Sequence, residues 1–199
     1  MRFAEVSLRL PEWVEDYVPD SETLYPTAED RMRLVIGLAR ENLRRGTGGP
    51  FGAAIFEKES WRLISPGVNV VVPQNNSAAH AEMVAIMVAQ AGLGTFDLGG
   101  EGRPAYELVT STEPCAMCFG AVPWSGVRTI VCGARDEDAR GCGFDEGAKI
   151  SDWATELEER GISVERDVLR EESAEVLREY ANSGGVIYNG RRGENGEEE

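Results

Sequence analysis

The first strongly patterned segment of the chain predicts an amphipathic helix over residues 27–45. Thr27 suits the N-cap of a helix, and Asp30 follows three positions later, as in a capping box. Gly46 suits the end of the helix, where a left-handed residue is common. Between these ends, apolar residues recur at intervals of three and four, which is the helical period: Met32, Val35, Ile36, Ala39 and Leu43.

The rest of the chain alternates between short apolar runs and helical patterns. We expect strands at residues 52–57, 61–72, 106–112, 127–134 and 162–169, with Pro66-Gly67 breaking the second strand. We expect helices at residues 77–90 (stopped by Gly92), from Glu113-Pro114 to an end or bend near Val122 and Pro123, at 153–160 and at 171–182, with an irregular segment at 135–152. Alternating helices and strands favour an α/β fold, a three-layer α/β/α sandwich.

The length of 199 residues is typical of one domain with additions. Residues 1–26 contain three prolines and several aromatic residues, and we interpret them as an extended arm lying on the domain. Residues 27–189 then form the domain itself. Residues 190–199, GRRGENGEEE, are expected to be a disordered acidic tail.

The charge of the chain limits its partners. Twenty Lys and Arg residues against 35 Asp and Glu residues give a formal charge of −15. Such a surface repels phosphate, so duplex DNA and tRNA are poor candidates as partners. No apolar run approaches the ~20 residues that cross a bilayer, and residues 1–13 lack the apolar core of a signal peptide. A cytoplasmic protein that binds neither nucleic acid nor membrane is the expectation.

Three side chains suggest a metal site. Cys115 and Cys118 form a Cys-x-x-Cys pair at the front of a predicted helix, where both sulfurs face one side and the helix dipole favours thiolate. His80, the one histidine of the chain, also lies at the front of a predicted helix. Three such ligands without a fourth are typical of a catalytic zinc ion, whose open position holds water. Cys132 lies within a predicted strand and is interpreted as a small buried apolar residue.

Glu82 is the candidate proton carrier of this site. It lies two residues after His80, roughly 200° around an ideal helix, but in a first turn both side chains can flank an atom beyond the end of the axis. Zinc lowers the pKa of a bound water to about 7, and Glu82 could then carry the proton to a leaving nitrogen. Cys-x-x-Cys alone is also typical of a redox pair, and His-x-Glu alone says little. Together they match the H-x-E…P-C-x-x-C pattern of zinc deaminases.

With these residues the chain resembles the cytidine deaminase superfamily, and more narrowly the bacterial guanine deaminases. The similarity covers roughly residues 27–190. It is carried by residues 49–53 (GPFGA), Asn69, residues 79–82 (AHAE), residues 110–121 (TSTEPCAMCFGA), Trp124, residues 143–146 (GFDE) and residues 185–189 (GVIYN). The resemblance implies a central five-stranded mixed sheet flanked by helices. It also implies that His80, Cys115 and Cys118 bind zinc, that Glu82 shuttles protons and that the protein is a homodimer.

The resemblance further implies a set of residues that bind the base. Asn69 and the backbone of Ala81 would form hydrogen bonds with it, and Phe51 and Trp124 would contact its ring. Asn69 could instead be a left-handed turn residue after Pro66-Gly67, whereas the two aromatic residues could be ordinary core residues.

Two further residues would complete the site. Glu146 would read the base and assist proton movement to the leaving amine, unless it is a solvated loop acid or Asp145 takes this role. Tyr188, in the C-terminal segment, would close the site, and in some relatives this segment is exchanged between subunits.

The reaction that follows is zinc-dependent hydrolysis of free guanine to xanthine and ammonia, with ammeline as a side substrate. Water attacks the ring carbon C2, and Glu82 moves its proton first to the adjacent ring nitrogen and then to the amine. The alternatives are a deaminase of cytosine, cytidine or guanosine, a tRNA adenosine deaminase, and a non-catalytic module stabilised by zinc. The last has no use for Glu82, which is not a metal ligand.

Overall fold

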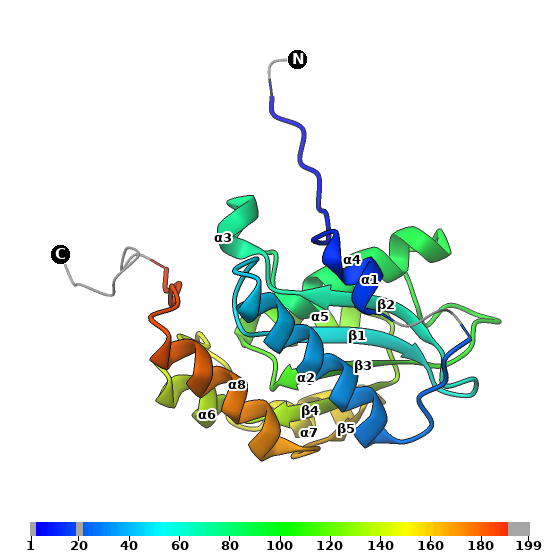
Figure 1. Ribbon diagram of the computed structural model, residues 1–199. Coiled ribbons are helices and arrows are strands. Elements are labelled where there is room, and N and C mark those ends of the chain that lie inside the picture. The colour runs from blue at the N-terminus through cyan, green and yellow to red at the C-terminus, as the bar shows by residue number, and fades with distance from the viewer. Residues whose placement is uncertain (1–2, 19–21, 191–199) are drawn as a thin grey trace.

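Five strands form one mixed sheet in the order β2-β1-β3-β4-β5 (Figure 1). The strands are β1 (Gly52–Glu57), β2 (Leu63–Val68), β3 (Tyr106–Thr112), β4 (Thr129–Ala134) and β5 (Ser163–Glu165). β1 is antiparallel to β2 and β3, whereas β3, β4 and β5 run parallel. The computed structural model describes residues 3–18 and 22–190, so residues 191–199 of the expected tail lie outside the described residues.

Helices cover both faces of the sheet. They are α1 (Trp13–Tyr17), α2 (Ala28–Arg44), α3 (Val71–Gln74), α4 (Ala81–Leu93), α5 (Ala116–Ser125), α6 (Asp136–Gly141), α7 (Trp153–Glu158) and α8 (Arg170–Asn182). Figure 1 shows α2 and α8 side by side in front of the sheet, with α4 behind it. The five-stranded mixed sheet and the three-layer arrangement predicted from the sequence are confirmed.

Side chains that alternate between the two faces of the sheet form two hydrophobic cores, one on each face. In β1, Ala54 and Phe56 belong to the core under α2, whereas Ala53 and Ile55 belong to the core under α4, α5 and α7. All four are fully buried. Successive side chains of a strand point to opposite faces, so the apolar run of β1 fits a strand covered on both sides.

The predicted cap of α2 is present. The Asp30 amide donates to the Thr27 hydroxyl oxygen at 3.1 Å, and the Thr27 amide donates back to the Asp30 carboxylate at 3.4 Å. α2 ends at Arg44, one residue before the predicted end, and Gly46 follows with φ +64°.

Several boundaries differ from the sequence predictions. β2 runs unbroken through Pro66, because an edge strand does not need every N–H for pairing. α4 starts at Ala81 rather than at residue 77, since the side chain of Asn76 accepts from the Ala78 amide and its carbonyl accepts from the Ala79 amide in a preceding turn. The helix continues through Gly92 to a left-handed cap at Gly94.

Three further predictions were wrong in part. Cys115 is the N-cap of α5, so Pro114 precedes the helix, and Pro123 lies within its last turn. The segment at 135–152 contains α6, whose first turn is capped by the Asp138 carboxylate, which accepts from the Arg135 amide. The N-terminal arm is not wholly extended, because α1 buries Trp13 against α2. Among the described residues, no helix combines the length and the apolar character that a membrane crossing needs.

Candidate active site

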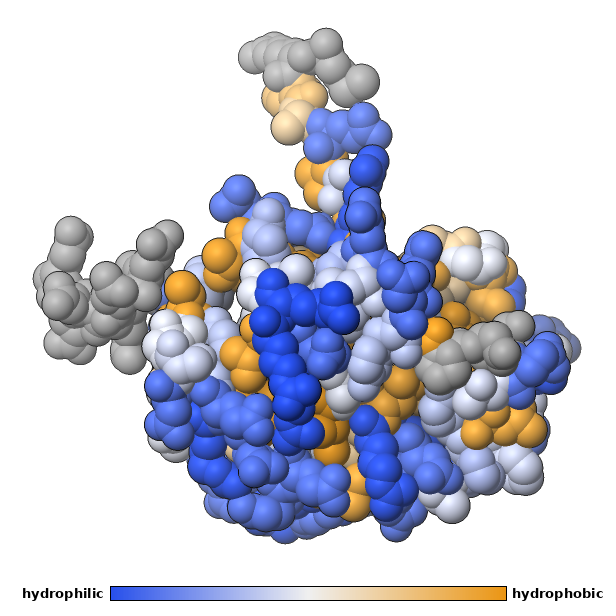
Figure 2. Space-filling view, viewed as in Figure 1, coloured by the Kyte–Doolittle hydropathy of each residue, from blue (hydrophilic) through white to orange (hydrophobic). Residues whose placement is uncertain are grey.

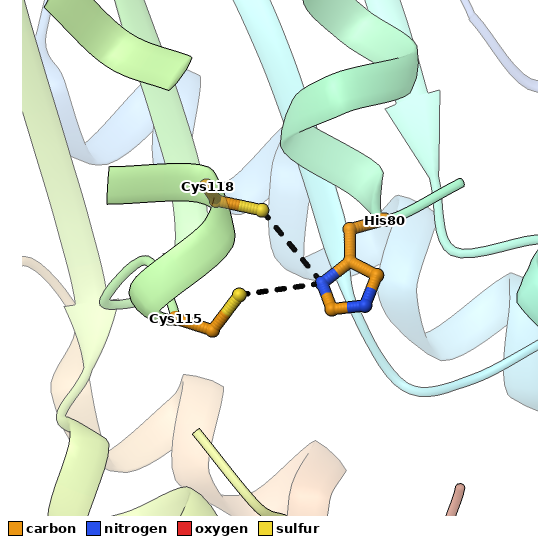
Figure 3. Close-up of side chains that lie close together, drawn as sticks. All are labelled: His80, Cys115 and Cys118. Carbon is orange, nitrogen blue, oxygen red and sulfur yellow. Dashed lines mark hydrogen bonds between the residues drawn. The ribbon is translucent and has the colours of Figure 1, made fainter. Parts of the chain in front are cut away.

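The three predicted metal ligands lie together at the adjacent N-termini of α4 and α5. His80 is the N-cap of α4, Cys115 is the N-cap of α5, and Cys118 follows in its first turn. Figure 3 shows both sulfurs pointing at one nitrogen of the imidazole. The distances from His80 Nδ1 are 3.5 Å to Cys115 Sγ and 3.7 Å to Cys118 Sγ.

These distances fit a shared zinc ion. Tetrahedral zinc with Zn–S of about 2.3 Å and Zn–N of about 2.0–2.1 Å places its sulfur and nitrogen ligands roughly 3.6 Å apart. Within residues 3–18 and 22–190, His80, Cys115 and Cys118 are the one cluster of metal-ligating side chains, and their ligand atoms all lie within 4.8 Å of one another. Cys132 is buried in β4, as predicted, and is not part of the cluster.

The electrostatics of the two thiols favour a cation at this point. A hydrogen bond from Cys118 and the nearby His80 lower the pKa of Cys115 to about 4, whereas the same hydrogen bond and burial raise the pKa of Cys118. A thiolate is therefore already preferred at Cys115 at neutral pH. Thiolate and imidazole are donors that zinc binds well.

Glu82 lies beside the cluster without belonging to it. Its side chain is buried in the first turn of α4 and lines the same pocket as His80 and Cys115. Burial and the negative charge of Cys115 raise its pKa above the ordinary value. A raised pKa makes the protonated form of this carboxyl group more accessible, which suits a general acid–base role.

The pocket in front of the ligands collects most of the other predicted residues. Phe51, Asn69, Glu146 and Tyr188 line it. Asn69 is buried at the end of β2 and is not among the left-handed residues, so the alternative turn interpretation is wrong. Its amide N–H donates to the Phe51 carbonyl at 3.1 Å, which fixes the two residues relative to each other.

The structure distinguishes the two neighbouring acids. Glu146 is buried, and burial together with the charges of Cys115 and Glu82 raises its pKa to about 8. Asp145 is exposed, and its carboxylate accepts from the Gly147 amide within its own turn. Both acids line the pocket, and burial favours Glu146 over Asp145 as the one that would exchange a proton there.

The loop that carries Glu146 is fastened to the start of α5. The Ala116 amide donates to the Glu146 carbonyl at 2.9 Å, and Lys149 Nζ donates to the Pro114 carbonyl at 3.0 Å. Lys149 also lies 3.6 Å from a carboxylate oxygen of the buried Glu113. These contacts hold the second acid at a fixed place beside the metal ligands.

Two residues that were predicted to contact the base, Trp124 and Ala81, do not line the pocket. Trp124 does not line the pocket and is 85% exposed. It lies six residues after Cys118, about 120° away around α5, so its side chain leaves the buried face of the helix. Ala81 is fully buried and is not among the residues that line the pocket, so the predicted contact of its backbone with the base stays a prediction.

Sequence reasoning missed two of the four aromatic residues that line the pocket, Phe144 and Tyr180. Phe144 packs edge-to-face against Phe51 with ring centroids 4.9 Å apart, and it stacks on Tyr180 at 6.0 Å. Phe144 belongs to the quoted GFDE segment, but no local pattern marks it as a pocket residue. Tyr180 belongs to α8, where its spacing indicates only a buried helix face.

Asn189 was missed as well. The Asp145 amide donates to its Oδ1 at 2.9 Å, and its Nδ2 donates to the Gly143 carbonyl at 3.0 Å. These bonds hold the C-terminal segment over the pocket, with Tyr188 half-exposed at the rim.

Comparison with known proteins agrees with this geometry. Residues 26–134 match the model of the cytidine and deoxycytidylate deaminase zinc-binding region, which is more than half of the chain. The chain belongs to this family.

Two relatives are similar over nearly their whole length. Guanine deaminase from Bacillus subtilis (strain 168) is 34% identical over 156 residues, which cover 77% of this chain and 96% of the relative. A solved structure of guanine deaminase from Nitrosomonas europaea is 47% identical with a TM-score of 0.85, and the match covers 89% of this chain and 97% of the other. A tRNA-specific adenosine deaminase from Buchnera aphidicola subsp. Schizaphis graminum (strain Sg) is more distant, at 30% identity over 66% of this chain and 79% of the relative.

Proposed function

We propose that this protein is a zinc-dependent guanine deaminase that converts free guanine and water to xanthine and ammonia. The observation that carries the proposal is one pocket that joins the metal ligands, the proton carrier Glu82 and a second buried acid, Glu146. The similarity to guanine deaminases along most of the chain favours guanine among the substrates of this family.

The residues of the pocket divide the chemistry between them. Zinc bound to His80, Cys115 and Cys118 would supply a Lewis acid that lowers the pKa of water to about 7. Glu82 takes a proton from the attacking water and delivers it to the ring nitrogen adjacent to C2. A bond from C2 to the water oxygen forms, and Glu82 then takes the second proton from that oxygen and delivers it to the exocyclic nitrogen. The bond from C2 to this nitrogen breaks, ammonia leaves, and C2 keeps the oxygen as a carbonyl.

Binding of the base follows from the shape and polarity of the walls. Phe51 and Phe144 offer apolar surface to a flat ring, and the buried Asn69 offers an amide to its polar edge. A protonated Glu146 can donate a hydrogen bond to the base or pass a proton to the leaving amine. Buried polar groups of this kind discriminate strongly against bases that leave them unpaired.

Solved structures of relatives support these two polar roles. One protein that is 48% identical to this chain, with a TM-score of 0.85 and coverage of 93% of this chain and 97% of the other, is described in complex with 2,6-diaminopurine. Related structures with 8-azaguanine carry a substitution at an asparagine or at a glutamate. Those two positions are separated by as many residues as Asn69 and Glu146, which supports a role in ligand binding for both residues here.

An ammonia-release screen tests the proposal. The zinc-loaded protein is incubated with guanine, guanosine, cytosine, cytidine, adenine, ammeline and tRNA. We expect the highest kcat/KM with guanine, weaker activity with ammeline, and low activity with guanosine, since the relatives that are similar along most of the chain are guanine deaminases. Fastest release from cytidine or from tRNA would contradict the assignment.

Two further expectations concern the state of the protein. The four cysteines are free. A metal site made of thiolates needs a compartment in which cysteines stay reduced, and this supports a cytoplasmic location. The homodimer stays a prediction. The exposed apolar residues Met87, Met117 and Trp124 on α4 and α5 are the surface that such a dimer would cover, and sedimentation measurements would test it.

A further inference from the structure

A chain of hydrogen bonds links the N-terminal helix to the pocket. The indole N–H of Trp13, in α1, donates to the Thr47 hydroxyl at 2.9 Å. That hydroxyl donates to Asn42 Oδ1 at 2.8 Å. Asn42 Nδ2 in turn donates to the carbonyls of Gly49 and Asn69, at 2.9 and 2.8 Å.

Each hydrogen bond from Trp13 to Asn69 has a fixed donor and a fixed acceptor. The hydroxyl of Thr47 has one hydrogen and can also accept, so it relays the direction from the indole to the amide. Asn42 is fully buried, and both hydrogens of its amide group are used on carbonyls. Buried hydrogen bonds that run in one direction strengthen one another. Loss of the Thr47 hydroxyl would leave the buried Asn42 Oδ1 without this donor, which costs free energy.

The far end of the chain is the base-binding part of the pocket. Gly49, Phe51 and Asn69 all line the pocket, and the Asn69 amide is bonded to the Phe51 carbonyl. The approach is close, because a Cβ at Gly48 would lie 1.8 Å from the Asn69 carbonyl oxygen and 2.7 Å from Asn42 Nδ2. A shift of the Asn42 amide therefore moves the backbone that carries the Asn69 side chain.

The near end is firmly docked. Trp13 is 8% exposed, the Arg45 guanidinium lies 5.4 Å from its ring centre, and the Tyr17 ring packs edge-to-face against it. Tyr17 also lies over Gly37 of α2, where a Cβ would come within 2.0 Å of the phenol oxygen. These contacts place the indole N–H opposite Thr47.

We propose that Asn42 is a positioning residue for base binding and that the N-terminal segment, through Trp13 and Thr47, holds its amide in the orientation that aligns Asn69 and Phe51 with the substrate. This inference rests on the proposed deaminase function. It gives residues 13–17 a role in substrate affinity, beyond covering apolar surface.

The test compares zinc-loaded variants at Thr47 and Trp13. Thr47→Val keeps the shape but removes the relay, Thr47→Ser retains the hydroxyl, and Trp13→Phe removes the indole N–H while keeping a ring. Tyr17→Phe is the matched control, because it keeps the ring that packs against Trp13 and removes only a hydroxyl that is outside the chain of hydrogen bonds. For each protein, KM and kcat for guanine, zinc content and the urea midpoint of unfolding are measured.

We expect Thr47→Val and Trp13→Phe to raise KM by about fivefold or more, as the loss of one buried hydrogen bond would, with kcat changed less than twofold. Thr47→Ser and Tyr17→Phe should keep the KM of the wild type. Amide hydrogen exchange of Gly48, Gly49, Phe51 and residues 69–71 should become faster in Thr47→Val but not in Thr47→Ser. Lower urea midpoints with an unchanged KM would show a merely structural role and overturn the proposal.

The exchange measurement keeps this result separate from the proposed function. If the wild type releases no ammonia from guanine, the substrate assignment fails. Faster exchange at Gly48, Gly49, Phe51 and residues 69–71 in Thr47→Val would still support the link from Trp13 to the pocket. Unchanged exchange in Thr47→Val contradicts that link whatever the substrate is.

Discussion

At the scale of single residues, the site depends on two carboxyl groups held in different surroundings. Glu82 lies in the first turn of α4 beside the metal ligands, whereas Glu146 is carried by a loop fastened to Pro114 and Ala116. Burial raises the pKa of both groups, and that of Glu146 rises to about 8. In the proposed reaction Glu82 takes a proton from water and supplies one to the amine, and a protonated Glu146 can assist at the amine.

Replacing Glu82 by Gln tests the first of these roles. Glutamine keeps the size of the side chain but cannot carry the proton, so we expect kcat for guanine to fall about 10²–10⁴-fold. Zinc content should stay at the wild-type level, because Glu82 lies outside the ligand cluster. Glu101→Gln, at an exposed loop position, is the control for loss of a carboxylate. Turnover by Glu82→Gln within threefold of the wild type would refute the shuttle role.

At the scale of secondary-structure elements, periodicity alone predicted most of the sheet and α2. It could not predict where α4 and α5 begin, because those starts depend on the turn at Asn76 and on Pro114 lying before the N-cap. The cluster of His80, Cys115 and Cys118, with Glu82 beside it, could be predicted because rare residue types occur at diagnostic spacing. Phe144 and Tyr180 could not, since tertiary packing alone brings a loop and α8 to the wall.

Gly67 controls how closely α4 approaches the sheet. A Cβ at this position in β2 would lie 2.3 Å from the Ala81 carbonyl oxygen and 2.6 Å from the Ala85 amide nitrogen. Both contacts are to the backbone of α4, so Gly67→Ala must push away the helix that begins next to His80. We expect the free energy of unfolding to fall by about 1–3 kcal/mol and zinc to dissociate more readily.

Gly92→Ala is the matched control for this prediction. Gly92 lies within α4, and a Cβ added there would meet no neighbouring atom within 4 Å. Alanine there should raise the free energy of unfolding by about 0.5–1 kcal/mol without affecting zinc. Urea unfolding and competition with a chelator measure both properties. Wild-type zinc affinity in Gly67→Ala would show that this close approach does not position His80.

At the scale of the whole molecule, the chain carries a formal charge of −15, and arginines pair with some of its acidic side chains. Figure 2 shows that the face over α2 and α8 is mostly hydrophilic. Next to it, Arg170 Nε donates to Asp138 at 2.9 Å and Nη2 to Glu137 at 2.6 Å, while Arg135 donates to Asp167 with two nitrogens at 2.7 Å. These pairs tie α6 and the segment after β5 to the start of α8, next to the loop that carries Glu146.

The free energy of unfolding at acidic pH should depend on these ion pairs. Hydrogen bonds from Arg170 lower the pKa of Asp138 below its ordinary 3.8. The folded state therefore binds this proton less tightly than the unfolded state. The stabilisation is complete above pH 3.8 and is lost as the pH falls through the folded value. Because the pair is partly exposed and screened by solvent, we expect Asp138→Asn to lower the free energy of unfolding by about 0.5–1 kcal/mol at pH 7.

The difference between Asp138→Asn and the wild type should shrink as the pH falls below 3.8, because the unfolded wild type then binds a proton that the folded state takes up only at lower pH. Asp152→Asn serves as the control, since Asp152 is exposed and makes no side-chain cap hydrogen bond at α7. Urea unfolding from pH 7 to pH 3 measures the three proteins side by side. A difference that stays constant across this range would mean that Asp138 acts through its hydrogen bond to the Arg135 amide, which an asparagine oxygen can also accept, rather than through its charge.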